Sequence, residues 1–467
     1  MFPKSRWLLA CLAAGIFVGS PTAAAAATHQ VWLSPKGRDA NPGTQSRPLR
    51  SLSQAWRRIP AADRGVWHLH LADGDYRANA PIYWDEHAAA VLIHGSGGSR
   101  RAVLPEVNAY GLRSFSLVGV RLVGGGDVFH CEKCIHVLVS HVIAVGTGQE
   151  TIKINQSTDV TVADSDVSGA NDNAFDAVAV QHLRLLRNHF HNAEDWCAYA
   201  KGGSEDVVVR GNLFNNCGTG GFTAGQGTGF QFMSWPFVHW EASDVLVENN
   251  SVRNVQGAAF GVNGGANVLI RNNLASNVGR RSHVLEVTWG LRSCDGEPGD
   301  PGRGACADYL SRGGWGTTAV SDGTNEARIP NSNVLIYDNV ISNPDGHSSQ
   351  WQVFQVPGPA DAEPGSGVPS PLRADDALRI VGNVIWDGGP SHELGLGGES
   401  CLPGSSCAAA TVRANNQINT RRPVLVALSS GWLARSGWVA SSAVHSAPVP
   451  AASVRVGSEP STWSSWP

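Results

Sequence analysis

The chain has 467 residues, of which 42% are hydrophobic and 16% are charged, and its formal net charge is -4. This balance excludes the basic surface that is typical of nucleic-acid-binding proteins, so we expect no nucleic-acid partner. The length is sufficient for a large hydrophobic core, and the 54 glycines suit a fold with many tight turns.

Residues 1–27 have the pattern of a secretory signal peptide. Lys4 and Arg6 precede an apolar run from Trp7 to Val18, and small residues follow at 25–27. The run is short for a membrane span, and no later stretch is long enough for one. A retained N-terminal anchor is the alternative. We expect a secreted or periplasmic mature protein without a membrane span.

Eight cysteines remain once Cys11 is removed with the signal peptide. They fall into four local pairs: Cys131/Cys134, Cys197/Cys217, Cys294/Cys306 and Cys401/Cys407. In an exported protein, such pairing predicts disulfides. The first pair has the spacing of half a zinc site, but no second ligand pair accompanies it.

The start of the mature chain predicts a strand followed by a short helix. Val31–Leu33 form the strand, and Ser51 is placed to cap a helix whose apolar side carries Leu52, Ala55, Trp56 and Ile59. Strands are also expected near residues 66–71, 91–94, 115–122 and 137–143. The helix is a suitable cover for the open end of a repetitive fold.

A repeat of about two dozen residues dominates the middle of the chain. Its copies include DVTVADSDVSG, HLRLLRNHFHN, DVVVRGNLFNN, DVLVENNSVRN and NVLIRNNLASN. Alignment places Val160, Leu183, Val207, Val245 and Val268 at one position, and further copies begin at Val334 and Leu378. Within a copy, Val207 and Val209 are expected to point inward and Val208 outward. One strand per repeat cannot bury its own apolar face, so the copies must stack.

Asparagines recur at equivalent turns of this repeat: Asn188, Asn212, Asn250, Asn273, Asn339 and Asn383. Asparagine tolerates the left-handed conformation, and stacked amides can bond from one coil to the next. The sequence therefore predicts an all-β protein with a parallel β-helix over residues 28–435. A Ser/Ala/Pro-rich tail follows over residues 436–467.

The segment SPKGRDANPGT, followed by RPLRSLSQAW, is similar to the entry segment of secreted right-handed β-helix proteins of the pectate-lyase-like superfamily. The resemblance implies a right-handed parallel β-helix with a short N-terminal capping helix. It also implies a role on carbohydrate. It does not identify one lyase family, and the Asp-Pro-His signature of alginate epimerases is missing.

Three stretches interrupt the repeat. The step from Val207 to Val245 contains GTGGFTAGQGTGFQFMSWPFVHWE, which predicts a long turn beside the strands. The others are Cys294–Ile329 and the Pro/Gly-rich segment Gly358–Arg373.

Four acidic residues form a candidate metal site. Asp172 and Asp195 lie seven residues after Ser165 and Asn188, so they are expected to face each other on neighbouring coils, with Asp176 and Glu194 close by. Carboxylates at this spacing repel unless a cation or proton intervenes. Oxygen ligands fit Ca²⁺. The alternative is a set of solvated turn residues.

A second group of residues predicts a polar groove beside these acids. Lys201, Asn263 and Glu286 each lie thirteen residues after a turn asparagine, and Lys153 precedes Asp176 by one coil. The other candidates are Gln231, His239, Glu241, Arg281 and His283, bordered by the aromatic residues Trp196, Tyr199, Trp235, Trp240 and Trp289. Aromatic faces beside polar groups suit sugar rings. Packing between coils is the alternative for each tryptophan, and a solvated surface lysine is the alternative for Lys201.

These residue types predict a polysaccharide lyase that acts on an acidic, uronate-containing glycan by β-elimination. Lys201 is the candidate base, Arg281 the partner of the substrate carboxylate, and His283 and Glu286 further acids or bases. A glycoside hydrolase or epimerase that uses Asp172, Asp195, Glu194 or Glu286 is one alternative. A non-catalytic carbohydrate-binding protein is the other. We expect a monomer.

Overall fold

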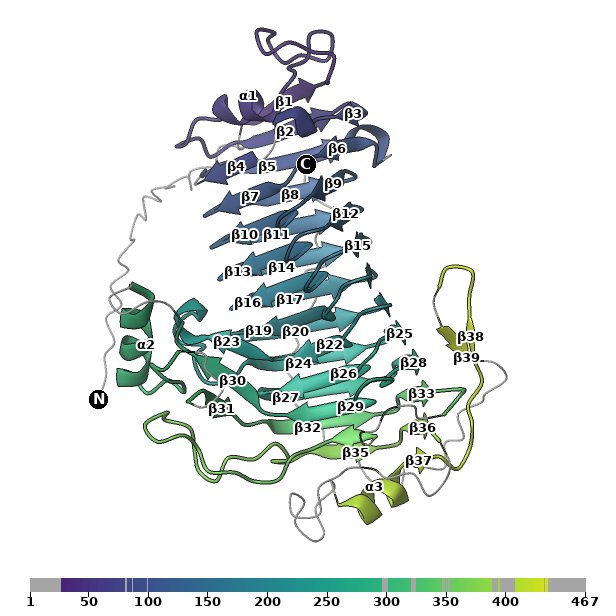
Figure 1. Ribbon diagram of the computed structural model, residues 1–467. Coiled ribbons are helices and arrows are strands. Elements are labelled where there is room, and N and C mark those ends of the chain that lie inside the picture. Colours follow the sequence, from purple (N-terminus) through teal and green to yellow (C-terminus); the bar gives the residue numbers. More distant parts are fainter. Residues whose placement is uncertain are drawn as a thin grey trace, which may run out of the picture.

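The computed structural model describes residues 27–435, with gaps at 80–81, 86, 99, 296–300, 321–324, 347–348, 350, 352, 389–393, 395–407 and 432. Three long parallel sheets run the length of the molecule and enclose one hydrophobic core (Figure 1). Each coil from β2 to β34 contributes one strand to each sheet before the chain returns to the first, and such parallel crossovers are right-handed. The predicted right-handed parallel β-helix is confirmed.

The first sheet contains the strands that the sequence repeat predicted. In spatial order it comprises β1 (Thr28–Leu33), β2 (Val66–Leu71), β5 (Ala90–Gly95), β8 (Phe115–Val118), β11 (Ile135–Ser140), β14 (Thr158–Ala163), β17 (Gln181–Leu186), β20 (Ser204–Arg210), β24 (Ala242–Glu248), β27 (Gly265–Arg271), β32 (Ser332–Tyr337) and β35 (Arg379–Val381).

The second sheet follows the first after a tight turn in each coil. It comprises β3 (Gly74–Asp75), β6 (Ala102–Leu104), β9 (Arg121–Gly124), β12 (Ile143–Gly146), β15 (Asp166–Ser168), β18 (His189–His191), β21 (Leu213–Asn215), β25 (Ser251–Arg253), β28 (Leu274–Ser276), β33 (Val340–Ser342), β36 (Val384–Trp386) and β37 (Gln417–Ile418).

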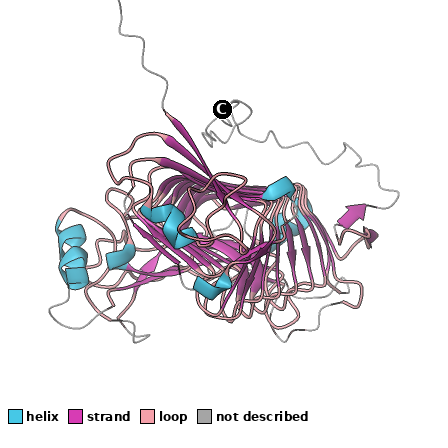
Figure 2. Ribbon diagram, turned by 90° about the horizontal axis from the view of Figure 1, so that it is seen from above, coloured by secondary structure: helices cyan, strands magenta, loops and turns pink. Residues whose placement is uncertain are grey.

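The third sheet completes each coil. It comprises β4 (Ile82–Asp85), β7 (Val107–Tyr110), β10 (Phe129–Glu132), β13 (Ile152–Asn155), β16 (Phe175–Val178), β19 (Trp196–Lys201), β22 (Gly220–Ala224), β26 (Phe260–Asn263), β29 (Leu285–Thr288) and β34 (Phe354–Gln355). Figure 2, in which the molecule is seen from above, shows the coils superimposed around the core.

The register of the first sheet agrees with the sequence alignment. Val160 pairs with Leu183, which pairs with Val207, and the row continues through Val245 and Val268 to Val334. All of these side chains are buried in the core. The spacing of the repeat therefore sets which residues become neighbours across coils.

The predicted asparagines form a continuous ladder inside the turn between the first and second sheets. Asn188, Asn212, Asn250, Asn273, Asn339, Asn383 and the further residue Asn416 are buried, and each amide bonds to the next along this series. Each ladder oxygen also accepts from the backbone N–H one coil earlier, as Asn250 does from Asn212 at 2.8 Å. The ladder thus satisfies buried backbone groups that no strand can reach.

One part of the asparagine prediction is wrong. The left-handed residue of this turn is the one before the ladder asparagine, such as Arg187, Gly211, Asn249 or Asn272, with φ between 54° and 65°. The ladder residue itself must direct its amide inward, so the preceding residue makes the sharp change of direction. Asparagines do take the left-handed conformation at the next turn, at Asn192, Asn216, Asn254 and Asn277.

The two ends of the β-helix are covered by short α-helices. Helix α1 (Leu52–Arg57) has Ser51 as its N-cap, whose side chain accepts from the N–H of Gln54, and it buries Leu52, Ala55 and Trp56. This confirms the predicted cap. Helix α3 (Ala409–Asn415) lies at the opposite end beside β35 and β37 (Figure 1).

The first two interruptions of the repeat fold together, and we call residues 225–240, 290–295, 301–320 and 325–329 the insertion. It contains β23 (Gly227–Gly229), β30 (Gly290–Ser293) and β31 (Ala327–Ile329), which form a small sheet, and α2 (Pro301–Ser311). The prediction that Gly220–Ala224 belong to a long turn is wrong, because these residues form β22 of the third sheet. Figure 1 shows the insertion projecting from one side of the β-helix.

Three of the predicted disulfides are present, joining Cys131 to Cys134, Cys197 to Cys217 and Cys294 to Cys306. The fourth pair, Cys401/Cys407, lies outside the described residues, as do the segment 1–26 and the tail 436–467. The predicted boundaries of the β-helix domain stay predictions. No helix of the described residues is long and apolar enough to cross a membrane.

The ladder generates a prediction about stability. The Asn250 amide donates to the carbonyl of Val209 at 2.9 Å, and its oxygen accepts from the N–H of Asn212 at 2.8 Å. Asn250→Ala leaves both backbone groups buried without these partners, so we expect the free energy of unfolding to fall by about 3 kcal/mol or more.

Urea unfolding followed by circular dichroism measures this change. Asn215→Ala is the control, because the half-buried side chain of Asn215 on β21 accepts only from the neighbouring Asn254. A loss of stability no larger in Asn250→Ala than in Asn215→Ala would contradict the role of the ladder.

Candidate active site

A cleft of about 550 Å³ lies on the outer face of the third sheet, where the insertion borders β13, β16 and β19. From the β-helix it is lined by Gln149, Glu150, Lys153, Asn155, Asp172, Asp176, Val178, Tyr199 and Lys201. From the insertion it is lined by Gly227, Thr228, Gly229, Phe232, Leu291, Ser293, Asp295 and Glu326. The cleft is the place where the regular scaffold and the irregular insertion meet, and its lining combines charged side chains with apolar surface.

Three cleft residues share one row of the third sheet. Lys153 pairs in register with Asp176, and Asp176 pairs with Tyr199 on the following strand. The Lys153 Nζ lies 3.4 Å from Asp176 Oδ2 and 3.6 Å from Glu150 Oε1. Lys153 therefore joins two carboxylates, and the predicted adjacency of Lys153 and Asp176 is present.

Burial shifts the protonation of this group. It raises the pKa of Glu150 to about 8, and the nearby charge of Asp176 adds to the rise, although Lys153 opposes it. Burial lowers the pKa of Lys153, but Asp176 and Glu150 more than offset this effect, so its pKa is raised. Lys153 thus stays charged, and Glu150 holds a proton near neutral pH.

Tyr199 closes the floor of the cleft. It is buried, and its hydroxyl accepts a hydrogen bond from Asn173 Nδ2 at 3.1 Å. Burial raises the pKa of the Tyr199 hydroxyl, and the charges of Asp176 and Glu150 raise it further. Tyr199 therefore keeps a neutral hydroxyl, and its ring lies beneath the Lys201 ammonium.

Lys201 stands at the end of β19 with its ammonium over the ring of Tyr199, 4.4 Å from the ring centroid. Its Nζ donates to Gln226 Oε1 at 3.2 Å. Among the described residues it makes no ion pair, whereas Lys153 lies 3.4 Å from Asp176 and 3.6 Å from Glu150. Of the two lysines, Lys201 is thus the one whose amine is not committed to a carboxylate.

The predicted pair Asp172 and Asp195 does lie on neighbouring coils. The Asp195 N–H donates to the Asp172 carbonyl at 2.9 Å, and burial together with the Asp195 charge raises the pKa of Asp172. Asp195 Oδ2 also accepts from Gln226 Nε2 at 3.4 Å, which connects this pair to Lys201. A cation between these carboxylates would relieve their repulsion.

The other two predicted metal ligands differ from this pair. Asp176 is engaged by Lys153, although its Oδ1 is buried without a hydrogen-bond partner. Glu194 is exposed and does not line the cleft. Of the four predicted ligands, the structure therefore places Asp172 and Asp195 on neighbouring coils, whereas Asp176 is engaged by Lys153 and Glu194 is exposed.

Glu241 is placed in the interior, which leaves it no surface for a substrate. It forms a fully buried ion pair with Arg292 of the insertion, at 2.5 Å. Its second oxygen accepts from the N–H of Gly202 at 3.0 Å and from the hydroxyl of Thr228 at 2.5 Å. Because Gly202 directly follows Lys201, Glu241 positions the end of β19.

Most of the predicted aromatic residues pack within the protein. Trp196 is buried with Tyr199 and Ala258, and Trp240 packs edge-on against Trp315. Trp235 is partly exposed, but the Arg312 guanidinium lies 3.7 Å from its ring centroid. Trp196 and Trp240 therefore pack inside the protein, as the alternative interpretation of the tryptophans predicted.

The remaining residues of the insertion also serve its own structure. His239 Nε2 lies 3.1 Å from the carbonyl of Gly313, and Gln231 Oε1 accepts from the N–H of Asp295. Trp289 is partly buried against the apolar cluster that contains Val368 and Leu372. None of these three predicted residues lines the cleft.

Glu286 is displaced from the row that its spacing predicted. It shares the row of Gly261, two positions before Asn263, because the turn at 279–282 adds residues to this coil. The Asn263 Nδ2 donates to Glu286 Oε1 at 3.1 Å, and burial raises the pKa of Glu286. Since β29 lies three strands from β19 in the third sheet, about 14 Å away, Glu286 cannot act on the same bond as Lys201.

Arg281 and His283 lie in the same part of the sheet as Glu286. Arg281 is exposed, and its Nη2 donates to Thr219 Oγ1 at 3.2 Å. His283 is buried, with its ring 6.2 Å from that of Trp351. Neither residue lines the cleft, so the structure separates them from Lys201.

The residues that sequence reasoning missed include Glu150, Thr228 and Phe232, which line the cleft, and Gln226, which accepts from Lys201. Glu150 precedes Lys153 by three residues, so its proximity to the polar row was a usable signal. Phe232 is 52% exposed and lines the cleft, where its ring is available to a sugar. Its position, like those of Gln226 and Thr228, depends on the fold of the insertion and has no signal in the repeat.

No protein-family model and no curated protein matches the sequence. Solved structures do match. The mannuronan C-5 epimerase AlgE6 A-module of Azotobacter vinelandii is 13% identical, over 68% of this chain and 84% of that chain, with a TM-score of 0.42. A rhamnogalacturonan lyase is 12% identical, over 79% and 87%, with a TM-score of 0.43. An alginate lyase from Paenibacillus sp. is 11% identical, over 78% and 97%, with a TM-score of 0.36. These values are too low to transfer an activity to this chain.

Proposed function

We propose that this protein is a secreted polysaccharide lyase that cleaves an acidic, uronate-containing glycan by β-elimination in the cleft. The observation that carries the proposal is the state of Lys201, an amine in the cleft that makes no ion pair among the described residues, beside the carboxylates of Asp172 and Asp195. The monomeric state belongs to the same proposal.

In this reaction, Lys201 in its neutral amine form removes the proton from C5 of the uronate and becomes an ammonium. The electron pair forms the C4–C5 double bond, and the bond from C4 to the glycosidic oxygen breaks. The leaving oxygen requires a proton, and the Glu150 carboxyl, with its raised pKa, is the donor that the cleft offers. Phe232 supplies an apolar face for a sugar ring.

A bound cation would account for the excess of carboxylates in a cleft that receives an acidic substrate. Asp172 and Asp195 would hold Ca²⁺, with the unpartnered oxygen of Asp176 nearby. When bound, Ca²⁺ neutralises the substrate carboxylate and so stabilises the carbanion that forms at C5. Lys153, fixed between Glu150 and Asp176, reduces the remaining negative charge.

Glycoside hydrolysis is the second candidate, and the protonation of Glu150 favours it. A protonated carboxyl beside an ionised one is the arrangement that general-acid hydrolysis requires, with Glu150 as acid and Asp172 or Asp176 as its partner. The two reactions leave different products, because only β-elimination creates an unsaturated uronate.

Lys201→Ala should lower the rate of β-elimination by roughly 100-fold or more, because it removes the base. The ultraviolet absorbance of the unsaturated uronate, recorded with pectate, alginate and glycosaminoglycans, measures this rate. Lys133→Ala is the matched control, since Lys133 also lies over a tyrosine ring, Tyr110 at 4.8 Å, but outside the cleft. An equal loss in both variants, or reducing ends without ultraviolet absorbance, would contradict the lyase.

Chelation of Ca²⁺ should abolish the activity of the wild-type protein, and added Ca²⁺ should restore it. Asp195→Asn should raise the Ca²⁺ concentration required for half of full activity by about tenfold, because it removes one charged ligand. The exposed Glu194→Gln serves as control. Full activity in the presence of chelator would contradict the Ca²⁺ requirement, but it would not contradict the role of Lys201 as the base.

Glu150→Gln should change the dependence of stability on pH. The folded-state pKa of Glu150 is about 8 and its ordinary value is 4.5, so the native state binds the proton more tightly than the unfolded state. The wild-type protein therefore loses stability as the pH rises from 4.5 to 8. The stability of Glu150→Gln relative to wild type should rise across this window, as measured by urea unfolding on both sides of it. A constant difference would show that Glu150 is ionised in the folded protein.

A further inference from the structure

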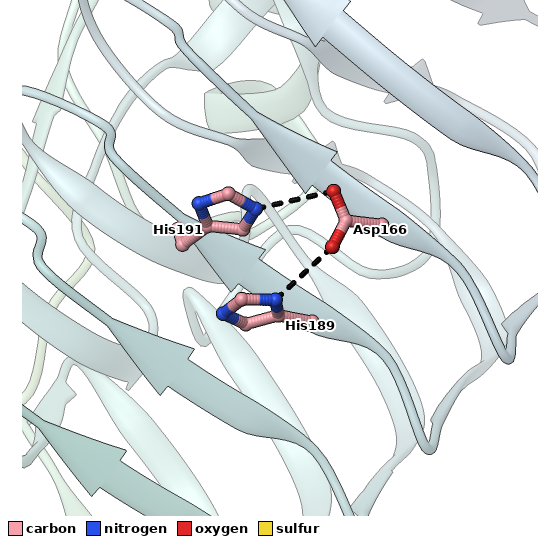
Figure 3. A group of neighbouring side chains, drawn as sticks. All are labelled: Asp166, His189 and His191. Atoms are coloured by element: carbon pink, nitrogen blue, oxygen red, sulfur yellow. Dashed lines mark hydrogen bonds and ion pairs between the residues drawn. The ribbon is translucent and has the colours of Figure 1, made fainter. Parts of the chain in front are cut away.

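The outer face of the second sheet carries a second constellation, formed by Asp166 on β15 and by His189 and His191 on β18 (Figure 3). Asp166 pairs in register with His189, and His191 follows two residues later on the same face of the strand. This sheet is distinct from the third sheet, which carries the cleft, and the proposed lyase reaction uses none of these residues.

The ligand atoms of the three side chains converge. His189 Nδ1 lies 3.1 Å from Asp166 Oδ2, and His191 Nε2 lies 3.2 Å from Asp166 Oδ1. One ligand atom from each residue lies within 4.8 Å of the others. In a tetrahedral zinc site with bonds near 2.0 Å, neighbouring ligand atoms are about 3.3 Å apart. The two histidine–carboxylate separations, each to one oxygen of Asp166, are thus close to the separation that a metal ion requires.

The imidazoles are held in this orientation by their surroundings. Their rings stack with centroids 3.9 Å apart and an interplanar angle of 16°. In the register of the sheet, Ile143 lies beside Asp166 and Leu213 beside His189, so apolar side chains border the group on both sides. All three side chains are only partly exposed. The three side chains are therefore already ordered by the fold, and metal binding loses little further conformational entropy.

The chemistry of the donors selects the ion. Two imidazole nitrogens and one carboxylate oxygen suit Zn²⁺ and other divalent transition metals, whereas Ca²⁺ and Mg²⁺ prefer oxygen ligands alone.

We propose that Asp166, His189 and His191 form a binding site for one divalent transition-metal ion, Zn²⁺ in the first instance. Three protein ligands leave one tetrahedral position for water or another small ligand. The ion would connect β15 to β18, which belong to successive coils, and would therefore stabilise their stacking.

The test is a calorimetric titration of Zn²⁺ into the full-length mature protein, prepared without a histidine tag and stripped with chelator. Excess Ca²⁺ is present throughout, so that Zn²⁺ binding to the cleft carboxylates does not contribute to the measured heat. We expect one Zn²⁺ per chain, with affinity roughly 10- to 100-fold weaker in His191→Gln and in Asp166→Asn. Zn²⁺ should also raise the unfolding temperature of the wild-type protein, and bound Co²⁺ should show the visible spectrum of a four-coordinate site.

The matched control is His136→Gln. His136 faces Asp159 across neighbouring coils of the first sheet at 3.1 Å, but no third ligand completes that group among the described residues. Binding should be unchanged in this variant. Equal binding by wild type and by His189→Gln/His191→Gln would overturn the proposal, as would the absence of binding to the stripped wild-type protein. The two histidines would then only form hydrogen bonds with Asp166.

Discussion

The asparagine ladder is the constraint on which the rest of this structure depends. Each coil must turn sharply between the first and second sheets, and this turn leaves backbone groups inside the protein without strand partners. The ladder amides supply these partners and at the same time bond to one another, as Asn250 does to Asn212 and Asn273. From Ser165 and Asn188 onward, one polar residue per coil therefore fixes both the turn and the vertical register, whereas earlier coils have the apolar Val120 and Val142 at this position. Every side chain that follows in the coil inherits its position from that register.

The sequence predicts the fold well because this constraint has a fixed spacing. Where successive copies are 23 or 24 residues apart, counting from the ladder finds true neighbours, such as Asp172 with Asp195 and Lys153 with Asp176. Counting fails where a coil contains extra residues. Glu286 is the clearest case, because the turn before β29 moves it two positions away from the row of Asn263.

The parts of the site that could not be predicted come from the insertion. A repeat reports only on residues that recur, and the insertion occurs once. Phe232 lines the cleft and Gln226 accepts from Lys201, while Trp240 and His239 pack among insertion residues. Nothing in their local sequence separates the first two from the second two. Their positions follow from a separate small core around Phe230, Met233 and the Cys294–Cys306 disulfide.

The buried ion pair of Glu241 and Arg292 connects this separate core to the chemistry. Removing two charges from water is costly, and the pair is stable only if every remaining donor and acceptor is satisfied. Here Glu241 also accepts from Gly202 and Thr228, and Arg292 also donates to the carbonyls of Val238, His239 and Trp315. These bonds fasten the insertion to the residue that follows Lys201. A buried pair of this kind adds little net stability but admits only one arrangement, so it determines where the wall of the cleft stands relative to the proposed base. The insertion, although irregular, is thus held in a fixed position relative to the β-helix.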